Sequence, residues 1–304
     1  MYDIIIVGAG TAGLTAAIYG VRAGRRVLVL EEKVYGGQIM SASEVENYPG
    51  IRNISGYEFA EGLYRQAADL GAELRFEKVC RIQEGADFKT VYTAKSKYEC
   101  RTVILATGAR NRKLGVEREE ELTGSGVSYC ATCDGAFYRG RDVAVVGGGN
   151  TALEDALFLS AYCRTVYLIH RRKQFRGEEK LLAAARAKKN IVWIIESRVT
   201  ALKGEARLEA VVTEENGTGK RRELPAEALF IAIGQEPDNR AFSGLVTLDE
   251  HGYIAASEDT LTSSEGIFAA GDCRTKTVRQ LTTAAADGAA AALAACSFLS
   301  GTEV

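Results

Sequence analysis

Two stretches of similar sequence decide the fold. Residues 3–32 read DIIIVGAGTAGLTAAIYGVRAGRRVLVLEE, and residues 142–171 read DVAVVGGGNTALEDALFLSAYCRTVYLIHR. Each residue of the second stretch stands 139 positions after its counterpart in the first. Both run from an apolar segment through a glycine-rich turn and a segment with apolar residues at 3–4 spacing to a second apolar segment. This order predicts two βαβ units, each with a dinucleotide-binding fingerprint in its first turn.

The small residues of each turn have separate tasks. The first permits a tight turn, the second lets the backbone approach a pyrophosphate, and the third keeps the helix close to the strand. A single turn of this kind is weak evidence, whereas two copies in the same context are strong. The predicted positions are Gly8, Gly10 and Gly13 in the first turn, and Gly147, Gly149 and Ala152 in the second.

The two copies differ where the second strand ends. The first ends in Glu31, whereas the second is followed by Arg171 and Arg172, with Arg176 about one helical turn further on. A carboxylate in this position accepts hydrogen bonds from a ribose 2′-hydroxyl, as in FAD or NAD, and repels a 2′-phosphate. Guanidinium groups bind that phosphate instead, so the second unit is expected to prefer NADP(H). A solvated basic patch is the alternative interpretation of the arginines.

Three further apolar strands end in small residues, at 103–108, 229–234 and 266–272. Strands that end in glycine at the carboxyl edge of a sheet suit the close approach of a ligand. The late strand is assigned to the first unit, because the second unit already has its own.

This assignment predicts an α/β fold with two Rossmann-like, three-layer nucleotide-binding domains, the second inserted in the first. The first domain is expected over residues 1–112 and 242–304, and the second over residues 113–241. Both boundaries between the domains are polar. Two linkers that run from one domain to the other would allow the domains to rotate against each other.

Composition excludes several classes of protein. The 304 residues are 46% hydrophobic and 26% charged, with a net charge of −2, so nucleic acid is not an expected partner. The Ala-rich run 281–299 contains Asp287 and is expected to be a packed helix, not a membrane span. Seven cysteines and the absence of a leader-like N-terminus predict a cytoplasmic protein with mainly reduced thiols.

The chemistry is expected at residues 129–138, which read YCATCDGAFY. Cys130 and Cys133 could belong to a metal site, a structural staple or a redox pair. A zinc site needs four ligands, but the other cysteines stand singly and the chain has two histidines, so no metal is expected. The redox interpretation is preferred because NADPH supplies a hydride that a disulfide accepts poorly, and a flavin can bridge the two. Asp134 could carry the proton released when a thiolate forms.

Over essentially its whole length the sequence resembles the bacterial low-molecular-weight thioredoxin reductases. The matching stretches are GAGTAG at 8–13, GGQI at 36–39, EVENYPG at 44–50, CATCDG at 130–135, GGGNTA at 147–152, HRRKQFR at 170–176, FAAGD at 268–272 and RQLTTAAADG at 279–288. The order and spacing of CATCDG and HRRKQFR are highly specific.

The resemblance implies roles for individual residues. Cys133 would face the flavin, Cys130 would attack the partner disulfide, and Asp134 would be the acid–base group. It also implies a homodimer with thioredoxin as acceptor, in which the NADPH domain swings between two orientations. The implied FAD contacts are Gly8, Gly10, Gly13, Glu31, Gly37, Gln38, Asn47, Gly108, Asp272 and Gln280. The implied NADPH contacts are Gly147, Gly149, Asn150, Thr151, Arg171, Arg172 and Arg176.

Two alternatives stay open at this point. The acceptor could be another small dithiol protein, such as a glutaredoxin-like redoxin or a carrier linked to a peroxidase. The chain could instead be a flavin- and nucleotide-binding sensor without turnover, although a sensor has no need of an acid–base residue beside its dithiol.

Overall fold

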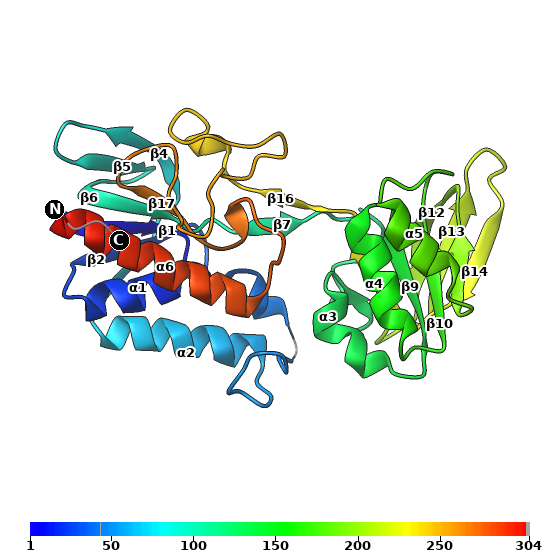
Figure 1. The fold of residues 1–304 in the computed structure, drawn as a ribbon. Coiled ribbons are helices and arrows are strands. Elements are labelled where there is room, and N and C mark those ends of the chain that lie inside the picture. The colour runs from blue at the N-terminus through cyan, green and yellow to red at the C-terminus, as the bar shows by residue number, and fades with distance from the viewer. Residues whose placement is uncertain (43, 302–304) are drawn as a thin grey trace. The chain divides into compact units, whose positions relative to one another are not determined.

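The computed structural model describes residues 1–42 and 44–301. The chain divides into two compact units, one formed by residues 1–110 and 236–304 and the other by residues 111–235 (Figure 1). Each unit is built on a sheet covered by helices, and the predicted α/β class with two Rossmann-like units is confirmed.

The first unit contains a seven-stranded sheet in the order β3-β2-β1-β6-β5-β4, with β17 paired to β6. Its elements are β1 (Tyr2–Val7), α1 (Thr11–Arg22), β2 (Val27–Glu31), η1 (Gly37–Ser41), α2 (Gly56–Asp69), β3 (Glu73–Phe76), β4 (Val79–Glu84), β5 (Lys89–Thr93), β6 (Lys97–Leu105), η3 (Arg240–Phe242), β17 (Ile267–Ala269), η4 (Gly271–Cys273) and α6 (Leu281–Ser300). Short strands β7 (Ala109–Asn111) and β16 (Gln235–Pro237) pair with each other where the chain passes between the units.

Strand β6 explains how the late strand joins the first unit. Its first half pairs antiparallel with β5, and residues Val103–Leu105 pair parallel with β17. The strand assigned from sequence to the first unit therefore does complete that sheet.

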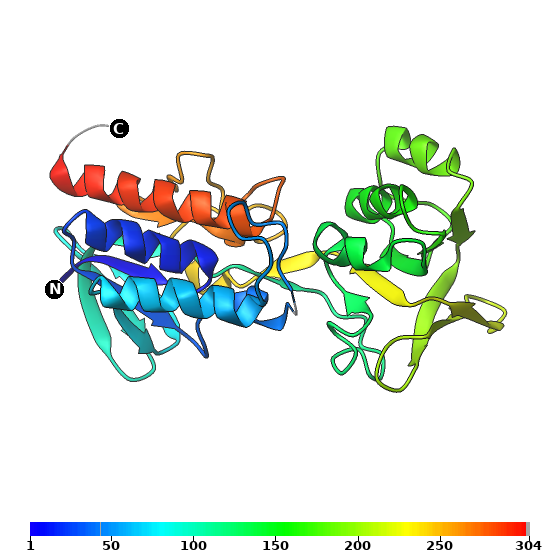
Figure 2. The ribbon, with the colours of Figure 1, turned by 90° about the horizontal axis from the view of Figure 1, so that it is seen from below.

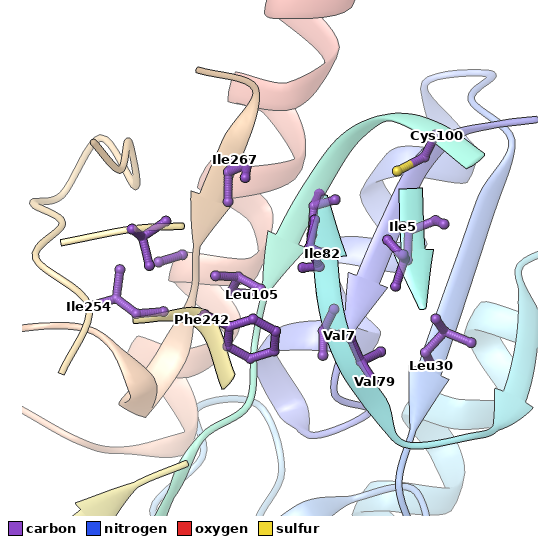
Figure 3. Close-up of a cluster of buried hydrophobic side chains, with 14 of the residues drawn as sticks. Ile5, Val7, Leu30, Val79, Ile82, Cys100, Leu105, Phe242, Ile254 and Ile267 are labelled. Carbon is purple, nitrogen blue, oxygen red and sulfur yellow. The ribbon is translucent and has the colours of Figure 1, made fainter. Parts of the chain in front are cut away.

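Both faces of this sheet are buried because β1 is apolar at nearly every position. Ile4 and Ile6 pack with α1 and α6 on one face, and Ile5 and Val7 pack on the other. Figures 1 and 2 show α6, α1 and α2 side by side. Figure 3 shows the opposite cluster, in which Phe242 lies against the sheet.

The second unit has three layers. A parallel sheet in the order β11-β10-β9-β15-β8 lies between helices and an antiparallel sheet in the order β12-β13-β14. Its elements are β8 (Val127–Ser128), α3 (Ala131–Asp134), η2 (Gly135–Tyr138), β9 (Asp142–Gly147), α4 (Asn150–Ser160), β10 (Thr165–Ile169), α5 (Glu179–Arg186), β11 (Ile191–Ile194), β12 (Ser197–Lys203), β13 (Ala210–Glu215), β14 (Arg221–Pro225) and β15 (Ala228–Ala232).

The second boundary between the units lies between residues 235 and 236, earlier in the chain than residue 241, where the sequence predicts it. Asn239 is 1% exposed, and its side chain bonds to Thr107, Gly252 and Cys273 in the first unit. Phe242 is part of that unit's core. The polar run Pro237–Arg240 is therefore a bonded part of the first unit.

Helix α6 is long and apolar enough to cross a membrane by composition. Ala291, Ala295 and Leu299 instead pack into the first unit's core, and Asp287 is buried in ion pairs. Helix α6 is therefore a packed helix of this unit.

Candidate functional site

Cys130 and Cys133 form a disulfide with a Cα–Cα distance of 5.3 Å. Strand β8 leads directly into this pair and is paired in parallel with β15, which fixes its position at the edge of the sheet. Cys130 has extended backbone angles and precedes the short helix α3, which contains Cys133 and Asp134. The remaining five cysteines are free thiols.

Asp134 is fastened to the same strand. Its Oδ2 accepts a hydrogen bond of 2.5 Å from Ser128 Oγ, and that Oγ accepts one of 3.0 Å from the Cys130 N–H. Burial raises the pKa of Asp134, and the hydrogen bond from Ser128 opposes the rise. A carboxyl group whose pKa is raised by burial holds a proton more readily than an ordinary aspartate, which suits it to proton transfer.

The glycine turn of the second unit fits a bound phosphate group. A Cβ on Gly147 would lie 2.3 Å from the Ala232 carbonyl oxygen, so this position must be glycine for packing. At Gly149, by contrast, the described chain has no atom within 4 Å of an added Cβ. Gly149 is therefore open to a ligand, at the N-terminus of α4 where backbone N–H groups favour an anion.

Helix caps support the same interpretation. Helix α2 begins with a capping box between Ser55 and Glu58. Helices α1 and α4 have Gly10 and Gly149 as their N-cap residues, and glycine has no side chain with which to bond the first N–H groups. A helix that receives a phosphate has its first N–H groups left for that ligand.

Asn150, at the start of α4, is engaged with a neighbouring loop. Its Oδ1 accepts the Glu178 N–H at 2.8 Å, and its Nδ2 donates to the Glu178 carboxylate at 3.0 Å. Arg176 N–H donates to the Gly148 carbonyl at 2.7 Å, so the arginine-containing loop is tied to the glycine turn. Thr151 follows on the exposed side of the helix.

The charges of the three predicted phosphate-binding arginines all act on one histidine, His170. Arg171, Arg172 and Arg176 are exposed. Burial lowers the pKa of His170, and the positive charges of all three arginines lower it further. The His170 ring is 6% exposed and lies against Gly148, which makes it a support for the loop.

The first unit brings Glu31 to its own glycine turn. Glu31 Oε2 accepts the Ala9 N–H at 2.9 Å, and Oε1 accepts the Lys33 N–H at 3.1 Å. The neighbouring Glu32 forms ion pairs with Lys78 and Arg110. Of the two adjacent carboxylates, Glu31 is therefore the one that bonds to the glycine turn.

The tight packing around this turn depends on glycine. A Cβ on Gly13 would lie 1.9 Å from the Gly8 carbonyl oxygen, whereas one on Gly10 would meet its nearest neighbour at 4.0 Å. Gly37 lies beside Gly10, because a Cβ added to Gly37 would be 3.5 Å from the Gly10 Cα. In the first turn, Gly13 is therefore required for close packing, whereas Gly10 leaves space for a ligand.

Asp272 gives the clearest sign of a missing polar partner. It lies in η4, and its Oδ1 is buried without a hydrogen-bond partner among the described residues. Burial raises the pKa of Asp272. A buried unpaired carboxylate oxygen is costly, and a ligand hydroxyl group would relieve that cost.

Other predicted flavin contacts also come together from distant segments. Asn47 Nδ2 donates to Gln280 Oε1 at 3.3 Å. Gln38 Nε2 donates to the Ala109 carbonyl, next to Gly108. The fold therefore collects these residues on one unit, as a common ligand requires.

Sequence reasoning did not identify Ser128. The residue lies in a two-residue strand, which has no periodicity to detect. A hydroxyl residue two positions before the first cysteine was the available signal. Within residues 1–42 and 44–301, no group of three His, Cys, Asp or Glu side chains is arranged to hold a metal ion.

A cysteine disulfide beside a half-buried carboxyl group, in a chain with two dinucleotide-type turns, defines a nucleotide-dependent disulfide oxidoreductase. Residues 2–288 match the family described as pyridine nucleotide-disulphide oxidoreductase. The chain belongs to this family, which confirms the resemblance seen in the motifs.

Similar proteins cover nearly the whole chain. A thioredoxin reductase of Mycolicibacterium smegmatis is 44% identical over 96% of this chain and 95% of its own. One from Treponema pallidum is 43% identical over 98% of this chain and 97% of its own. The crystal structure of thioredoxin reductase from Streptococcus pyogenes is 39% identical, with a TM-score of 0.95 over 99% of both chains.

Proposed function

We propose that this protein is an NADPH-dependent thioredoxin-disulfide reductase. Electrons pass from NADPH through FAD and the Cys130–Cys133 disulfide to thioredoxin. The observation that carries this proposal is the disulfide itself, formed beside a carboxyl group whose pKa burial has raised. The relatives named thioredoxin reductase support the choice of acceptor.

We assign FAD to the first unit. Its open turn at Gly10 would take the pyrophosphate, Glu31 the adenosine ribose, and the unpaired Asp272 oxygen a hydroxyl of the ribityl chain. When bound, FAD accepts a hydride from NADPH and passes two electrons to a disulfide. The remaining proposed contacts are Gly8, Gly13, Gly37, Gln38, Asn47, Gly108 and Gln280.

We assign NADPH to the second unit. Its pyrophosphate would bind at the N-terminus of α4, where Gly149 leaves space. The exposed guanidinium groups of Arg171, Arg172 and Arg176 would bind the 2′-phosphate, which favours NADPH over NADH. Gly147, Asn150 and Thr151 complete the proposed contacts.

The reduced cysteines then act in two exchange steps. The Cys130 thiolate attacks one sulfur of the partner's disulfide, which forms a mixed disulfide and releases one partner thiolate. The Cys133 thiolate attacks the Cys130 sulfur, which restores the Cys130–Cys133 bond and releases the second partner thiolate. The two protons of the enzyme thiols pass to the two partner thiolates, and Asp134 is the proposed carrier.

We further propose a homodimer that works in the cytoplasm. The free state of the five other cysteines supports a reducing compartment. The two connections between the units support a rotation of the NADPH unit during turnover.

The host's own thioredoxins and other redoxins, each tested for NADPH consumption, decide the acceptor. Rapid steady turnover with a thioredoxin is the expected result. Turnover with only another redoxin would retain the chemistry but change the acceptor. A single stoichiometric reduction with every disulfide, including a small aromatic one, would show a sensor and contradict an enzyme.

A further inference from the structure

Ser128 joins the first cysteine of the dithiol to the carboxyl group behind the second. It is buried, at 6% exposure, and β8 holds it by pairing with Phe230 of β15. Its hydroxyl group lies 2.5 Å from Asp134 Oδ2 and 3.0 Å from the Cys130 nitrogen. The same sheet edge therefore anchors both chemical groups.

The donors and acceptors in this arrangement are well defined. A serine hydroxyl has one hydrogen to donate and two lone pairs to accept with. The Cys130 N–H can only donate, so Ser128 Oγ accepts there. The hydroxyl hydrogen goes to Asp134 Oδ2, because the Cys130 carbonyl is farther away at 3.3 Å.

A third hydrogen bond links Asp134 directly to Cys130. The Asp134 N–H donates to the Cys130 carbonyl at 3.1 Å. Asp134 is thus held at its backbone by Cys130 and at its side chain by Ser128. The backbone and the side chain of Asp134 are therefore both fixed by bonds to residues 128–130.

We propose that Ser128 is a positioning residue that holds in place the proton-carrying carboxyl group of Asp134, the residue directly after Cys133, through a hydrogen bond to its ionised form. The inference rests on the proposed function, since it assigns a task within the thiol–disulfide exchange. In that exchange Asp134 takes a proton from an enzyme thiol and gives it to a departing partner thiolate. Ser128 itself gains and loses no proton.

Other titratable groups around Asp134 do not supply this effect. Tyr138 lies on η2. Its own burial raises the pKa of Tyr138, and the charge of Asp134 raises it further. Asp155 and Tyr162 lie on or directly after α4, which packs against α3. Burial raises the pKa of Asp134, and among neighbouring groups Ser128 is the one that opposes the rise.

The test is the Ser128→Ala variant of the full-length flavoprotein. Loss of a hydrogen bond to a charged group should lower disulfide turnover at pH 7 by about tenfold and move its pH profile to higher pH. The Asp134 carboxyl signal, followed by ¹³C NMR and identified by its absence from Asp134→Asn, should titrate at higher pH. This second readout needs no turnover, so it stands even if thioredoxin is not the acceptor.

Control variants separate positioning from general stability. Ser197→Ala removes another buried strand hydroxyl, which donates to the Ile195 carbonyl at 2.9 Å, and should leave profile and titration unchanged. Ser128→Thr keeps the hydroxyl group and should keep the wild-type pH profile of turnover. This variant still tests the proposal if Ser128→Ala fails to fold. In a protein that already has Asp134→Asn, adding Ser128→Ala should lower turnover only slightly further.

Three results would overturn the proposal. One is an unchanged Asp134 titration in Ser128→Ala. Another is an equal loss of turnover in the presence and absence of the Asp134 carboxyl group. The third is a profile moved to higher pH in Ser128→Thr despite its hydroxyl.

Discussion

Arg274 and Asp287 form a buried, two-pronged ion pair in the first unit. Arg274 Nε donates to Asp287 Oδ2 and its Nη2 donates to Asp287 Oδ1, both at 2.8 Å. Asp287 Oδ2 also accepts the Gly271 N–H at 2.9 Å and Lys276 Nζ at 2.9 Å. One carboxylate on α6 therefore holds the turn that contains Asp272, a proposed flavin contact.

Removal of one member of this pair should be strongly destabilising. Arg274→Met leaves a buried carboxylate with less compensation, and the free energy of unfolding should fall by about 3 kcal/mol. The measurement is urea unfolding of the wild-type protein and the variant. Arg65→Met breaks an exposed pair with Glu61 and should have far less effect. Equal effects of the two variants would contradict the structural role of Arg274.

The same carboxylate predicts a loss of stability in acid. Burial alone would raise the pKa of Asp287, but its bonds to Arg274 and Lys276 outweigh burial and hold the pKa below its usual value. A depressed pKa contributes stability above the unfolded-state value of about 4, and this contribution disappears as pH falls through the folded-state pKa. Asp287→Asn should therefore flatten the acid limb of the stability curve. An acid limb as steep as that of the wild type would contradict the prediction.

The carboxylate of Asp272 should lower the stability of the flavin-free protein and strengthen the binding of FAD. Burial raises the pKa of Asp272, so its ionisation at neutral pH opposes folding of the flavin-free protein. Asp272→Asn should raise the unfolding temperature of flavin-depleted protein and weaken FAD binding by about tenfold. Thermal unfolding and flavin fluorescence measure the two effects. Unchanged FAD affinity would mean that the unpaired oxygen serves another purpose.

The arginine cluster should determine the choice of nicotinamide nucleotide. Arg171→Ala or Arg172→Ala removes a charge-assisted contact and should lower the NADPH/NADH preference by about ten- to a hundredfold. The ratio of kcat/KM for the two nucleotides measures this preference. Lys173→Ala removes a neighbouring exposed cation and is the matched control. An unchanged ratio in both arginine variants would place the phosphate site elsewhere.

Cys133 should separate the two halves of the reaction. Cys133→Ser should leave the flavin reducible by NADPH but abolish disulfide reduction, because no dithiol remains to carry two electrons. Anaerobic flavin absorbance and thioredoxin reduction measure the halves. Cys80→Ser changes an exposed free thiol and should change neither. Disulfide reduction at the wild-type rate in Cys133→Ser would refute the assigned role.

The sequence revealed the parts of this protein that repeat or have regular spacing. The two βαβ units were visible because apolar strands and glycine turns recur in the same order. The charge difference between Glu31 and Arg171 was visible because Glu31 ends a strand and Arg171 stands two residues after one. The confirmed family resemblance rests on these same segments.

Features that depend on long-range pairing could not be read in this way. Asn239 looks like part of a polar linker, but its side chain bonds to three distant positions of the first unit. Ser128 belongs to a strand too short to show a pattern. Asp287 in an Ala-rich helix gives no hint that Arg274 is its partner, because that pairing depends on how the chain folds back.

The most direct test of electron flow is to count thiols after anaerobic addition of one equivalent of NADPH to the oxidised flavoprotein. Rapid alkylation and mass spectrometry identify which cysteines were reduced. The proposed function predicts that Cys130 and Cys133 become alkylated together and that added thioredoxin restores their disulfide. NADPH oxidation that leaves the Cys130–Cys133 peptide disulfide-linked, with thioredoxin nevertheless reduced, would contradict the proposed route.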